Sequence, residues 1–305
     1  MATVRVELLA ADHDGTAAGS SPHVAVVTLD DPRRRNMLSG PMVSELVAAF
    51  DALEADTSVG AIVITGAPPA FCAGADLSGL SAASGLSVAP GGDAGADGDA
   101  DALAASALYA IYEGFLRVSR CSLPTVAAVN GPAVGAGMNL ALACDVRVMG
   151  GSGRMDCRFL ELGLHPGGGH TWMLSRIVGP ETAAAMVLFG QVVSGEEAVE
   201  RGLAWRCLED ADLLGGAVQL ASVAASAPRE LEQRVKETLG AIGQLGDHRA
   251  AVDFELEAQI WSLSQTFFAE RLAALRQRIS GGRQRGGGRD VAGSEASATS
   301  KRRGS

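Results

Sequence analysis

Two glycine-rich segments, each following a run of apolar and β-branched residues, are the part of this sequence best suited to chemistry. The segment TGAPPAFCAGADLSG (65–79) follows the run AIVIT, and the segment NGPAVGAGMNLALACD (130–145) follows TVAAV. In the second segment, Gly135 and Gly137 open an apolar run that we expect to be helical. The first N–H groups of a helix lack internal partners and lie at the positive end of its dipole, so they can hold an anion or a developing oxyanion.

Each segment taken alone also fits a purely structural role, because strand–glycine turn–helix junctions are common packing devices. The helices and strands around the two segments therefore decide between the two roles. Ser39 and Pro41 mark a helix start before a helix over 42–54. Further helices are expected over 102–119 and 135–144. The alternation of strands with helices predicts an α/β domain with largely parallel strands. The expected strands are Val4–Leu8, Val24–Leu29, Ala61–Thr65, Thr125–Val129 and Asp145–Val148.

The second part of the chain reads differently, because strands nearly stop after about residue 195. Ser194 and Glu197 form a capping-box pattern that opens a short helix. Helices are then predicted over 211–226, 229–240, 249–264 and 267–279. The small, acidic and glycine-rich stretch 81–101 predicts a mobile surface loop, and the tail from 281 on cannot bury enough apolar surface to fold. We therefore expect a core domain over 1–195, a helical region over 196–280 and a disordered tail over 281–305.

Composition excludes several classes of function. The chain has 305 residues, 47% of them hydrophobic, and a net charge of −10, which disfavours binding to nucleic acid or anionic lipid. Five widely spaced cysteines without a CxxC pattern predict neither a disulfide framework nor a metal site, and fit a reducing cytosol. No signal peptide or membrane-spanning run is recognised, so a cytoplasmic location is expected. The basic tail could suggest nucleic acid, but a solvated tail is the simpler interpretation.

Five ordered segments together carry a family resemblance. The chain resembles the crotonase family, also called the enoyl-CoA hydratase/isomerase family, over roughly 22–280. The resemblance implies a spiral of ββα turns followed by a helical trimerisation region, packed as a trimer or a dimer of trimers. It also implies an acyl-CoA thioester as the ligand, with no cofactor beyond the coenzyme A that the substrate carries. The segments are DDPRRRNMLSGPM (30–42), TGAPPAFCAGADL (65–77), LPTVAAVNGPAVGAGMNLALACDVRV (123–148), ELGLHPGGGHTWMLSRIVGPETAAAMVLFG (161–190) and SGEEAVERGL (194–203).

The resemblance also assigns residues to the thioester. It implies that the backbone N–H groups of Ala75 and Ala136 form an oxyanion hole, although the family often has glycine at the second position. One such donor is typically worth about 3 kcal/mol in the transition state. Arg33, supported by Arg34 and Arg35, matches a position near the nucleotide phosphates, while a solvated basic turn fits Arg34 and Arg35 equally well. The positions expected along coenzyme A are Ala73, Ala75, Asp76 and Leu77, with Asp76 also suited to capping backbone N–H groups.

The acid and base positions of the family do not carry acids here. The family's hydratases use two glutamates, and the matching positions in this chain are Asn139 and Phe159. Asparagine can orient a water but cannot take its proton at neutral pH, and phenylalanine can do neither. The usual pair of glutamates is therefore expected to be absent. Phe159 predicts an apolar cavity in place of a carboxylate.

Candidate replacements are few. Asp156 stands three residues before Phe159, one helical turn away if that stretch is helical, although a surface or capping role fits it better. His165 lies in the LHPGGG turn, and histidine is the usual acid or base near neutral pH. His170, just after that turn, fits a satisfied polar residue at a helix start. Glu161 and Glu113 are weaker candidates.

Three functions compete. The first is an acyl-CoA enzyme, an isomerase, hydrolase or lyase, that keeps the oxyanion hole and uses a substituted acid and base, in fatty-acid or related acyl-CoA metabolism. The second is a catalytically silent acyl-CoA carrier or sensor. The third is a Clp-type serine peptidase, which we set aside because neither glycine-rich segment places a serine at the helix entry. We favour the first.

Overall fold

The computed structural model describes residues 4–11, 22–76 and 98–286, and side chains of helical residues 98–101 and 280–286 are left out of the description. The chain divides into two compact units, Met1–Gly243 and Gln244–Ser305. Across the described stretches, no helix is both long enough and apolar enough to cross a membrane. The loop predicted over 81–101 lies outside the described residues as far as 97, and its end is wrong, because 98–101 belong to the helix Gly98–Ser119. The disordered tail predicted over 281–305 is likewise wrong for 281–286, which belong to the helix Thr266–Gly286, and its remainder lies outside the described residues.

The first unit is built on a six-stranded sheet whose order is β1-β2-β3-β4-β6-β9. All neighbouring pairs are parallel except the edge pair β1 and β2. The central β3 is buried along its whole length, as its continuous apolar run requires of a parallel strand covered on both faces. The strands are β1 (Val4–Ala10), β2 (His23–Leu29), β3 (Val59–Gly66), β4 (Thr125–Val129), β6 (Val146–Gly150) and β9 (Arg206–Leu208).

A second, three-stranded sheet lies beside the first, in the order β5-β7-β8. Its strands are β5 (Pro132–Val134), β7 (Arg154–Asp156) and β8 (Val193–Ser194), with β5 parallel to β7. The chain moves from one sheet to the other within each turn, from β4 to β5 and from β6 to β7, before a helix returns it. This is the predicted spiral of ββα turns, and the α/β fold class is confirmed. These short strands were not predicted.

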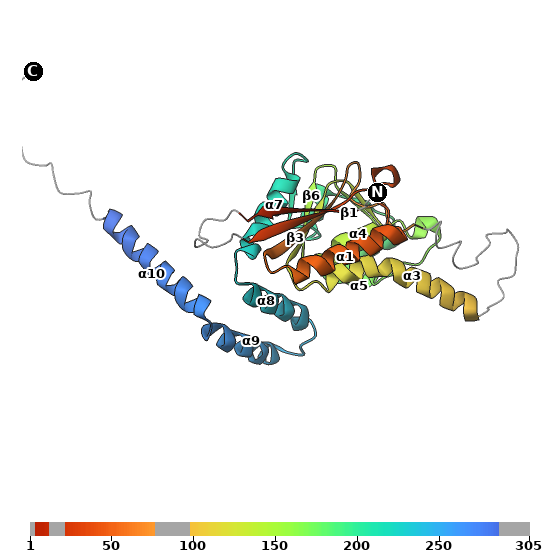
Figure 1. The fold of residues 1–305 in the computed structure, drawn as a ribbon. Helices are drawn as coiled ribbons and strands as arrows, with labels where there is room; N and C mark the ends of the chain where they lie inside the picture. The colour runs from red at the N-terminus through yellow and green to blue at the C-terminus, as the bar shows by residue number, and fades with distance from the viewer. Residues whose placement is uncertain (1–3, 12–21, 77–97, 287–305) are drawn as a thin grey trace, which may run out of the picture. The chain divides into compact units, whose positions relative to one another are not determined.

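Helices cover both faces of the large sheet (Figure 1). One core joins the sheet to α1, α3, α4 and α5, and a second joins its other face to α7. The caps follow the predicted signals: the Ser39 side chain accepts from Met42 N–H, and Ser194 with Glu197 forms a complete capping box. The helices are α1 (Gly40–Ala55), α3 (Gly98–Ser119), α4 (Ala136–Leu142), α5 (His170–Leu188), α6 (Gly195–Glu200), α7 (Leu213–Ala225) and α8 (Arg229–Ile242), with 3-10 turns η1 (Pro32–Arg34) and η2 (Leu160–Leu162).

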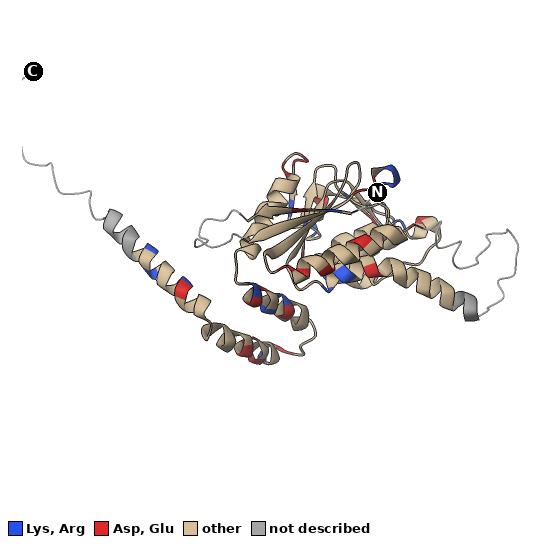
Figure 2. Cartoon of the chain, viewed as in Figure 1, with Lys and Arg blue, Asp and Glu red and all other residues tan. Residues whose placement is uncertain are grey.

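The second unit consists of α9 (His248–Leu263) and α10 (Thr266–Gly286). Asp247 caps α9 by accepting from Ala250 N–H at 2.9 Å, and the rings of Trp261 and Phe267 lie 6.1 Å apart where the two helices meet. The four helices predicted after residue 211 are confirmed as α7 to α10. The predicted end at 279 is too early, because α10 continues to Gly286. Figure 2 shows acidic and basic residues interspersed along α10 and along α8.

Candidate active site

The two glycine-rich segments lie against each other at the carboxyl ends of β3 and β4. Cys72 donates its backbone N–H to the carbonyl of Pro132 at 3.1 Å and accepts from the N–H of Val134 at 3.0 Å. A side chain at Gly137 would collide with the carbonyl oxygen of Cys72. Gly74 has φ +103, a conformation that favours glycine. The two segments therefore approach as closely as bare backbone allows.

This contact brings Ala75 and Ala136 to one pocket of about 200 Å³. Ala136 is the first residue of α4, so its N–H has no partner within the helix. Gly135, at φ +51, makes the turn that aims this end of the helix. Ala75 follows Gly74 and forms a bridge with Leu38. The two residues named as oxyanion donors thus share one cavity.

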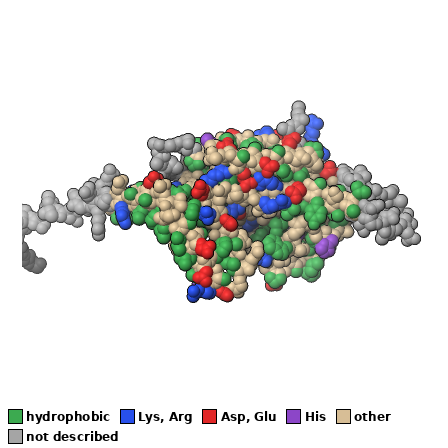
Figure 3. All heavy atoms as spheres, turned by 60° about the horizontal axis from the view of Figure 1, so that its bottom comes forward, with side chains coloured by type: hydrophobic (Ala, Val, Ile, Leu, Met, Phe, Trp, Pro, Cys, Tyr) green, Lys and Arg blue, Asp and Glu red, His purple; other side chains and the backbone are tan. Residues whose placement is uncertain are grey.

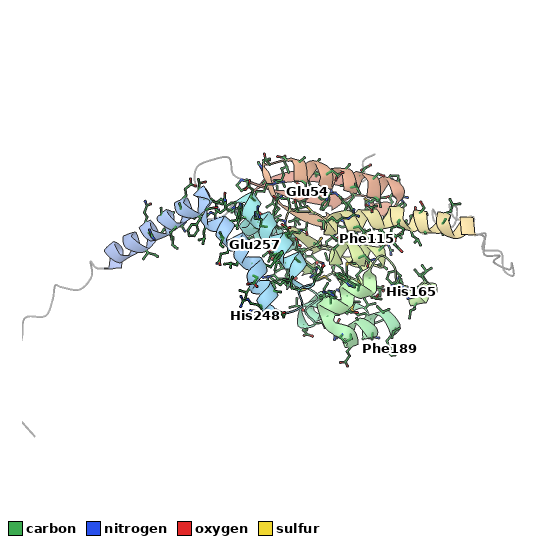
Figure 4. All side chains as sticks on the ribbon, turned by 90° about the horizontal axis from the view of Figure 1, so that it is seen from below. Glu54, Phe115, His165, Phe189, His248 and Glu257 are labelled. Carbon is green, nitrogen blue, oxygen red and sulfur yellow. The ribbon has the colours of Figure 1, made fainter. Side chains whose placement is uncertain are left out.

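The remaining walls of the pocket are mainly apolar. One comes from α3 and the other from the segment that runs from β7 to α5, and Figure 4 shows Phe115 on α3 and His165 near the start of α5. Such a cavity suits an apolar acyl chain. Besides Ala75 and Ala136, its lining residues are Ala73, Gly74, Leu108, Ile111, Tyr112, Val134, Gly135, Asn139, Cys157, Arg158, Phe159, Leu162, Leu164, His165 and Gly167.

A chain of polar contacts begins at Asn139 and runs behind the pocket. The Asn139 side-chain Nδ2 donates to the carbonyl of Gly167 at 3.0 Å, and its Oδ1 lies 2.6 Å from His170 Nδ1. The other ring nitrogen, His170 Nε2, lies 3.1 Å from Cys157 Sγ. Asn139 and His170 are each only 1% exposed. Their polar atoms are therefore satisfied inside the protein.

Burial keeps this network uncharged. Desolvation lowers the pKa of His170 to about 4, so the imidazole is neutral at neutral pH. Desolvation raises the pKa of the Cys157 thiol to about 12, with the nearby charge of Asp156 adding to the effect. The contact between them is that of a thiol with a neutral imidazole.

Phe159 covers the imidazole. Its ring meets that of His170 edge to face, with centroids 4.9 Å apart. The loop before α5 is pressed against α3, since a side chain at Gly168 would collide with the Phe115 ring, and Gly168 has φ +66. Phe159 is partly buried and packs against the core.

Comparison with known proteins decides the family. Residues 19–267 match the family described as enoyl-CoA hydratase/isomerase. This chain belongs to that family. It is 44% identical over 273 residues to a Mycobacterium tuberculosis protein named "Probable enoyl-CoA hydratase EchA14", covering 88% of this chain and 100% of the relative. It is 36% identical to the 2,3-dehydroadipyl-CoA hydratase of Escherichia coli, over 71% of this chain and 78% of the relative.

Solved structures agree with the family assignment. An enoyl-CoA hydratase from Bacillus anthracis matches with a TM-score of 0.75 and 26% identity, over 90% of this chain and 96% of that one. A Thermobifida fusca protein named as an enoyl-CoA hydratase, solved in complex with acetoacetyl-CoA, matches with a TM-score of 0.70 and 28% identity, over 86% and 95% of the two chains. The fold inferred from the crotonase resemblance is that of solved members of the family.

Of the candidate acids and bases, His165 lines the pocket that Ala75 and Ala136 share, whereas Asp156 and Glu113 are not among its described lining residues. His165 lines it, is exposed and has Nδ1 2.7 Å from the carbonyl of Pro166. Asp156 does not appear among the described lining residues. It ends strand β7, so the helical spacing considered for it does not occur, and its carboxylate lies 2.6 Å from Arg158 Nη2. Glu113 pairs with Arg120 at 3.0 Å on the surface of α3, outside the described pocket wall.

The predicted coenzyme A positions lie around the first glycine-rich segment. Arg33 is exposed in η1, and Arg34 pairs with Asp31 at 2.8 Å and with Asp76 at 3.8 Å. Ala73 donates its N–H to the carbonyl of Arg35 at 2.9 Å and lines the pocket. Leu77 lies outside the described residues. The basic turn thus sits directly beside the proposed oxyanion donor.

Asn36 holds that basic turn in place, a role not predicted from the sequence. It is fully buried, and its Nδ2 donates to the carbonyls of Ala67 at 2.7 Å and Ala70 at 2.8 Å. Its Oδ1 accepts from the N–H of Asp31 at 3.0 Å. Its left-handed φ of 57 is a conformation that asparagine tolerates better than most residues.

Within the described residues, no group of three or more His, Cys, Asp or Glu side chains suggests a metal site.

Proposed function

We propose that this chain is an acyl-CoA enzyme that stabilises the oxyanion of a bound thioester between the N–H groups of Ala75 and Ala136. The observation that carries the proposal is that both residues line one largely apolar pocket. Preorganised N–H donors in such a site act where charge develops in the transition state. The reaction then belongs to fatty-acid or related acyl-CoA metabolism, through an enolate or another thioester oxyanion.

The acid and base of this reaction differ from the glutamate pair of the family's hydratases. Asn139 and Phe159 occupy the matching positions, and neither side chain can transfer a proton at neutral pH. We retain His165 and, less directly, Asp156 as candidates. His165 has the better support because it lines the pocket. Coenzyme A is expected along Arg33, Ala73, Asp76 and Leu77.

A second candidate function is a catalytically silent acyl-CoA carrier or sensor. It is favoured by one observation: both polar ends of the Asn139 side chain are engaged by Gly167 and His170. A pocket that binds the thioester without a proton donor would hold it unchanged.

We also infer self-association as a trimer or a dimer of trimers, in the cytoplasm, with residues 1–195 as the core, the helices from 196 to the end of α10 as the assembly region and the residues after Gly286 as a disordered tail. Large apolar side chains exposed on the described helices support the assembly. Figure 3 shows one face on which hydrophobic side chains lie among acidic and basic ones. Measurement of the mass in solution tests this, and a monomer would contradict it. The exposed apolar side chains include Trp172 and Leu188 on α5 in the first unit and Phe254, Ile260 and Leu263 on α9 in the second, and Phe189 directly after α5 is exposed as well.

One experiment separates the two functions. Short and long enoyl-CoA esters are incubated with the protein, loss of the conjugated enoyl absorbance is followed, and binding is measured in parallel by calorimetry. Turnover that His165→Ala abolishes would support the enzyme with a substituted base. Tight binding with no turnover of any thioester would support the carrier. Absence of binding to every thioester would overturn both.

A further inference from the structure

Cys157, His170 and Asn139 form an ordered contact chain that the family's usual chemistry does not use. They come from three elements: the residue after β7, the first residue of α5 and the middle of α4. The distances are 3.1 Å from Cys157 Sγ to His170 Nε2 and 2.6 Å from His170 Nδ1 to Asn139 Oδ1. A thiol, an imidazole and an orienting amide in this order match the nucleophile, base and orienting group of thiol-dependent acyl transfer.

The hydrogen bonds assign the protons along this chain. Asn139 Nδ2 donates to the carbonyl of Gly167, so Oδ1 is the atom that faces His170 and must accept. His170 Nδ1 therefore carries the hydrogen of the neutral ring. His170 Nε2 is then unprotonated and is the nearer acceptor for the thiol of Cys157, at 3.1 Å, while Met138 Sδ lies 4.0 Å from the same sulfur. The imidazole is held in the tautomer that a general base needs.

The thiol also lies next to the proposed oxyanion donors. Strands β5 and β7 are parallel, with Val134 opposite Asp156, so Gly135 and Cys157 leave the sheet side by side. The N–H of Gly135 donates to the carbonyl of Asp156 at 2.9 Å. Cys157 and Ala136 both line the pocket. Cys157 therefore lines the same pocket as the backbone donors, on the strand next to the turn that carries Ala136.

We propose that Cys157 is a nucleophile that accepts the acyl group of the bound thioester, with His170 as its general base and Asn139 as a positioning residue. The ligand class is an acyl-CoA ester, and the overall activity is thioester hydrolysis through an acyl-cysteine. The inference rests on the proposed function, because it uses the same pocket and the same oxyanion donors.

The chemistry balances without any further reagent except water. In the first step the Cys157 thiol proton passes to His170 Nε2 while the sulfur attacks the thioester carbonyl carbon. The bond from that carbon to the coenzyme A sulfur breaks, and the departing thiolate takes the proton from His170. In the second step water attacks the acyl-cysteine, gives its proton to His170 and releases the carboxylic acid. The Cys157 thiolate then recovers the proton.

The environment explains why the thiol is not reactive at rest. With the pKa of Cys157 raised to about 12 and that of His170 lowered to about 4, the pair is neutral rather than a thiolate and an imidazolium. Proton transfer must accompany attack, as general-base catalysis requires. The oxyanion donors make that concerted step accessible, since they stabilise the charge on the carbonyl oxygen rather than on sulfur.

Intact-protein mass spectrometry of the full chain tests the proposal. The protein is incubated with a saturated acyl-CoA, which has no double bond to hydrate, and is quenched in acid. Released coenzyme A is measured by chromatography and acyl-CoA binding by calorimetry. The variants are Cys157→Ala and Cys157→Ser, which retain a small side chain. Cys144→Ala is the matched control, because Cys144 is an equally buried free thiol outside the described pocket wall, with its pKa also raised to about 12.

The expected result is an acyl mass increment that maps to Cys157, with coenzyme A release lowered at least about 100-fold in both Cys157 variants and unchanged in Cys144→Ala. His170→Asn should lower release to a similar extent. If the wild type binds the thioester but shows neither an adduct nor Cys157-dependent release, the inference is overturned while the proposed function stands. If no thioester binds at all, the proposed function itself fails.

Discussion

The pocket has two sides that differ in how they are built. The side that would hold the thioester is backbone, because Ala75 and Ala136 offer N–H groups that any residue except proline supplies. The constrained positions there are glycines where two stretches of backbone approach closely, such as Gly74 and Gly137. The side that would act on the thioester is made of side chains, which include those of Asn139, Phe159 and His165. A binding geometry carried by backbone can persist while the reactive side chains change.

The largest effect should come from removing one donor on the backbone side. Ala136→Pro deletes the N–H at the first position of α4, where helices tolerate proline, so the fold should be retained. We expect kcat/KM for thioester turnover to fall by about 100- to 1,000-fold, because one oxyanion donor is lost. Steady-state kinetics and the far-ultraviolet circular dichroism spectrum check activity and fold together.

Ala136→Gly is the matched control for that variant. It keeps the N–H and supplies the residue that the family often has at this position, so turnover should stay close to wild type. Equal losses in the proline and glycine variants would mean that the Ala136 side chain, and not its N–H, matters. That outcome would remove Ala136 from the oxyanion hole.

On the side of the pocket made of side chains, the buried imidazole of His170 should make the stability of the protein depend on pH. The pKa of His170 is about 4 in the folded protein, below the ordinary value of 6.5. Between these values the unfolded chain binds a proton that the folded chain does not, so the free energy of unfolding falls as pH drops through this window. The contribution is fully present above about pH 6.5, and roughly 2 kcal/mol of it should be lost by pH 5.

Urea unfolding at pH 7 and pH 5 measures this contribution against two variants. His170→Gln removes the titrating group, so its stability should fall less than that of the wild type over the same interval. Leu174→Ala, a cavity variant in α5, lowers stability without removing a titrating group and should keep the wild-type slope. An unchanged slope in His170→Gln would contradict the buried neutral imidazole.

Sequence patterns predicted some features of this fold and missed others. Features set by residues close together in the sequence could be predicted, and contacts between distant residues could not. The caps at Ser39 and Ser194 and the buried run of β3 depend on neighbours within a few residues, so they could be recognised. Strands β5, β7 and β8 have two or three residues each, too short for any periodicity. The same limit concealed the polar network behind the pocket: nothing in the local sequence connects Asn139 with His170, which meet only because the spiral fold brings α4 and α5 together.

Glu232, a buried carboxyl group outside the pocket, tests whether the reaction depends on pocket side chains alone. Burial raises the pKa of Glu232 on α8 to about 8, a value that would suit a general acid, and neither carboxylate oxygen has a hydrogen-bond partner among the described residues. Because the folded pKa is raised, the group's contribution to stability is present below its ordinary value of 4.5 and lost as pH rises towards 8. Glu232 does not line the described pocket wall, so its shift reflects desolvation rather than catalysis.

Glu232→Gln should therefore separate stability from turnover. At pH 8 the variant should gain up to about 4 kcal/mol of stability, because its neutral amide avoids the desolvation cost of the buried carboxylate, while turnover stays at the wild-type rate. Chemical denaturation at pH 5 and pH 8, with kinetics on the same samples, provides the measurement. A loss of turnover would place a proton donor on α8 and overturn the assignment of chemistry to the pocket side chains.

The smallest effect is expected at Glu113, the candidate carboxylate on the wall helix α3. It is exposed and paired with exposed Arg120, and such surface ion pairs contribute about 0–1 kcal/mol. Glu113→Gln should leave kcat and KM unchanged.

Tyr112→Ala, one residue earlier, provides the contrast. It removes a ring that lines the pocket and packs near Phe115, so it should raise KM for long acyl chains. If Glu113→Gln instead lowered kcat with KM unchanged, Glu113 would be the acid of the reaction.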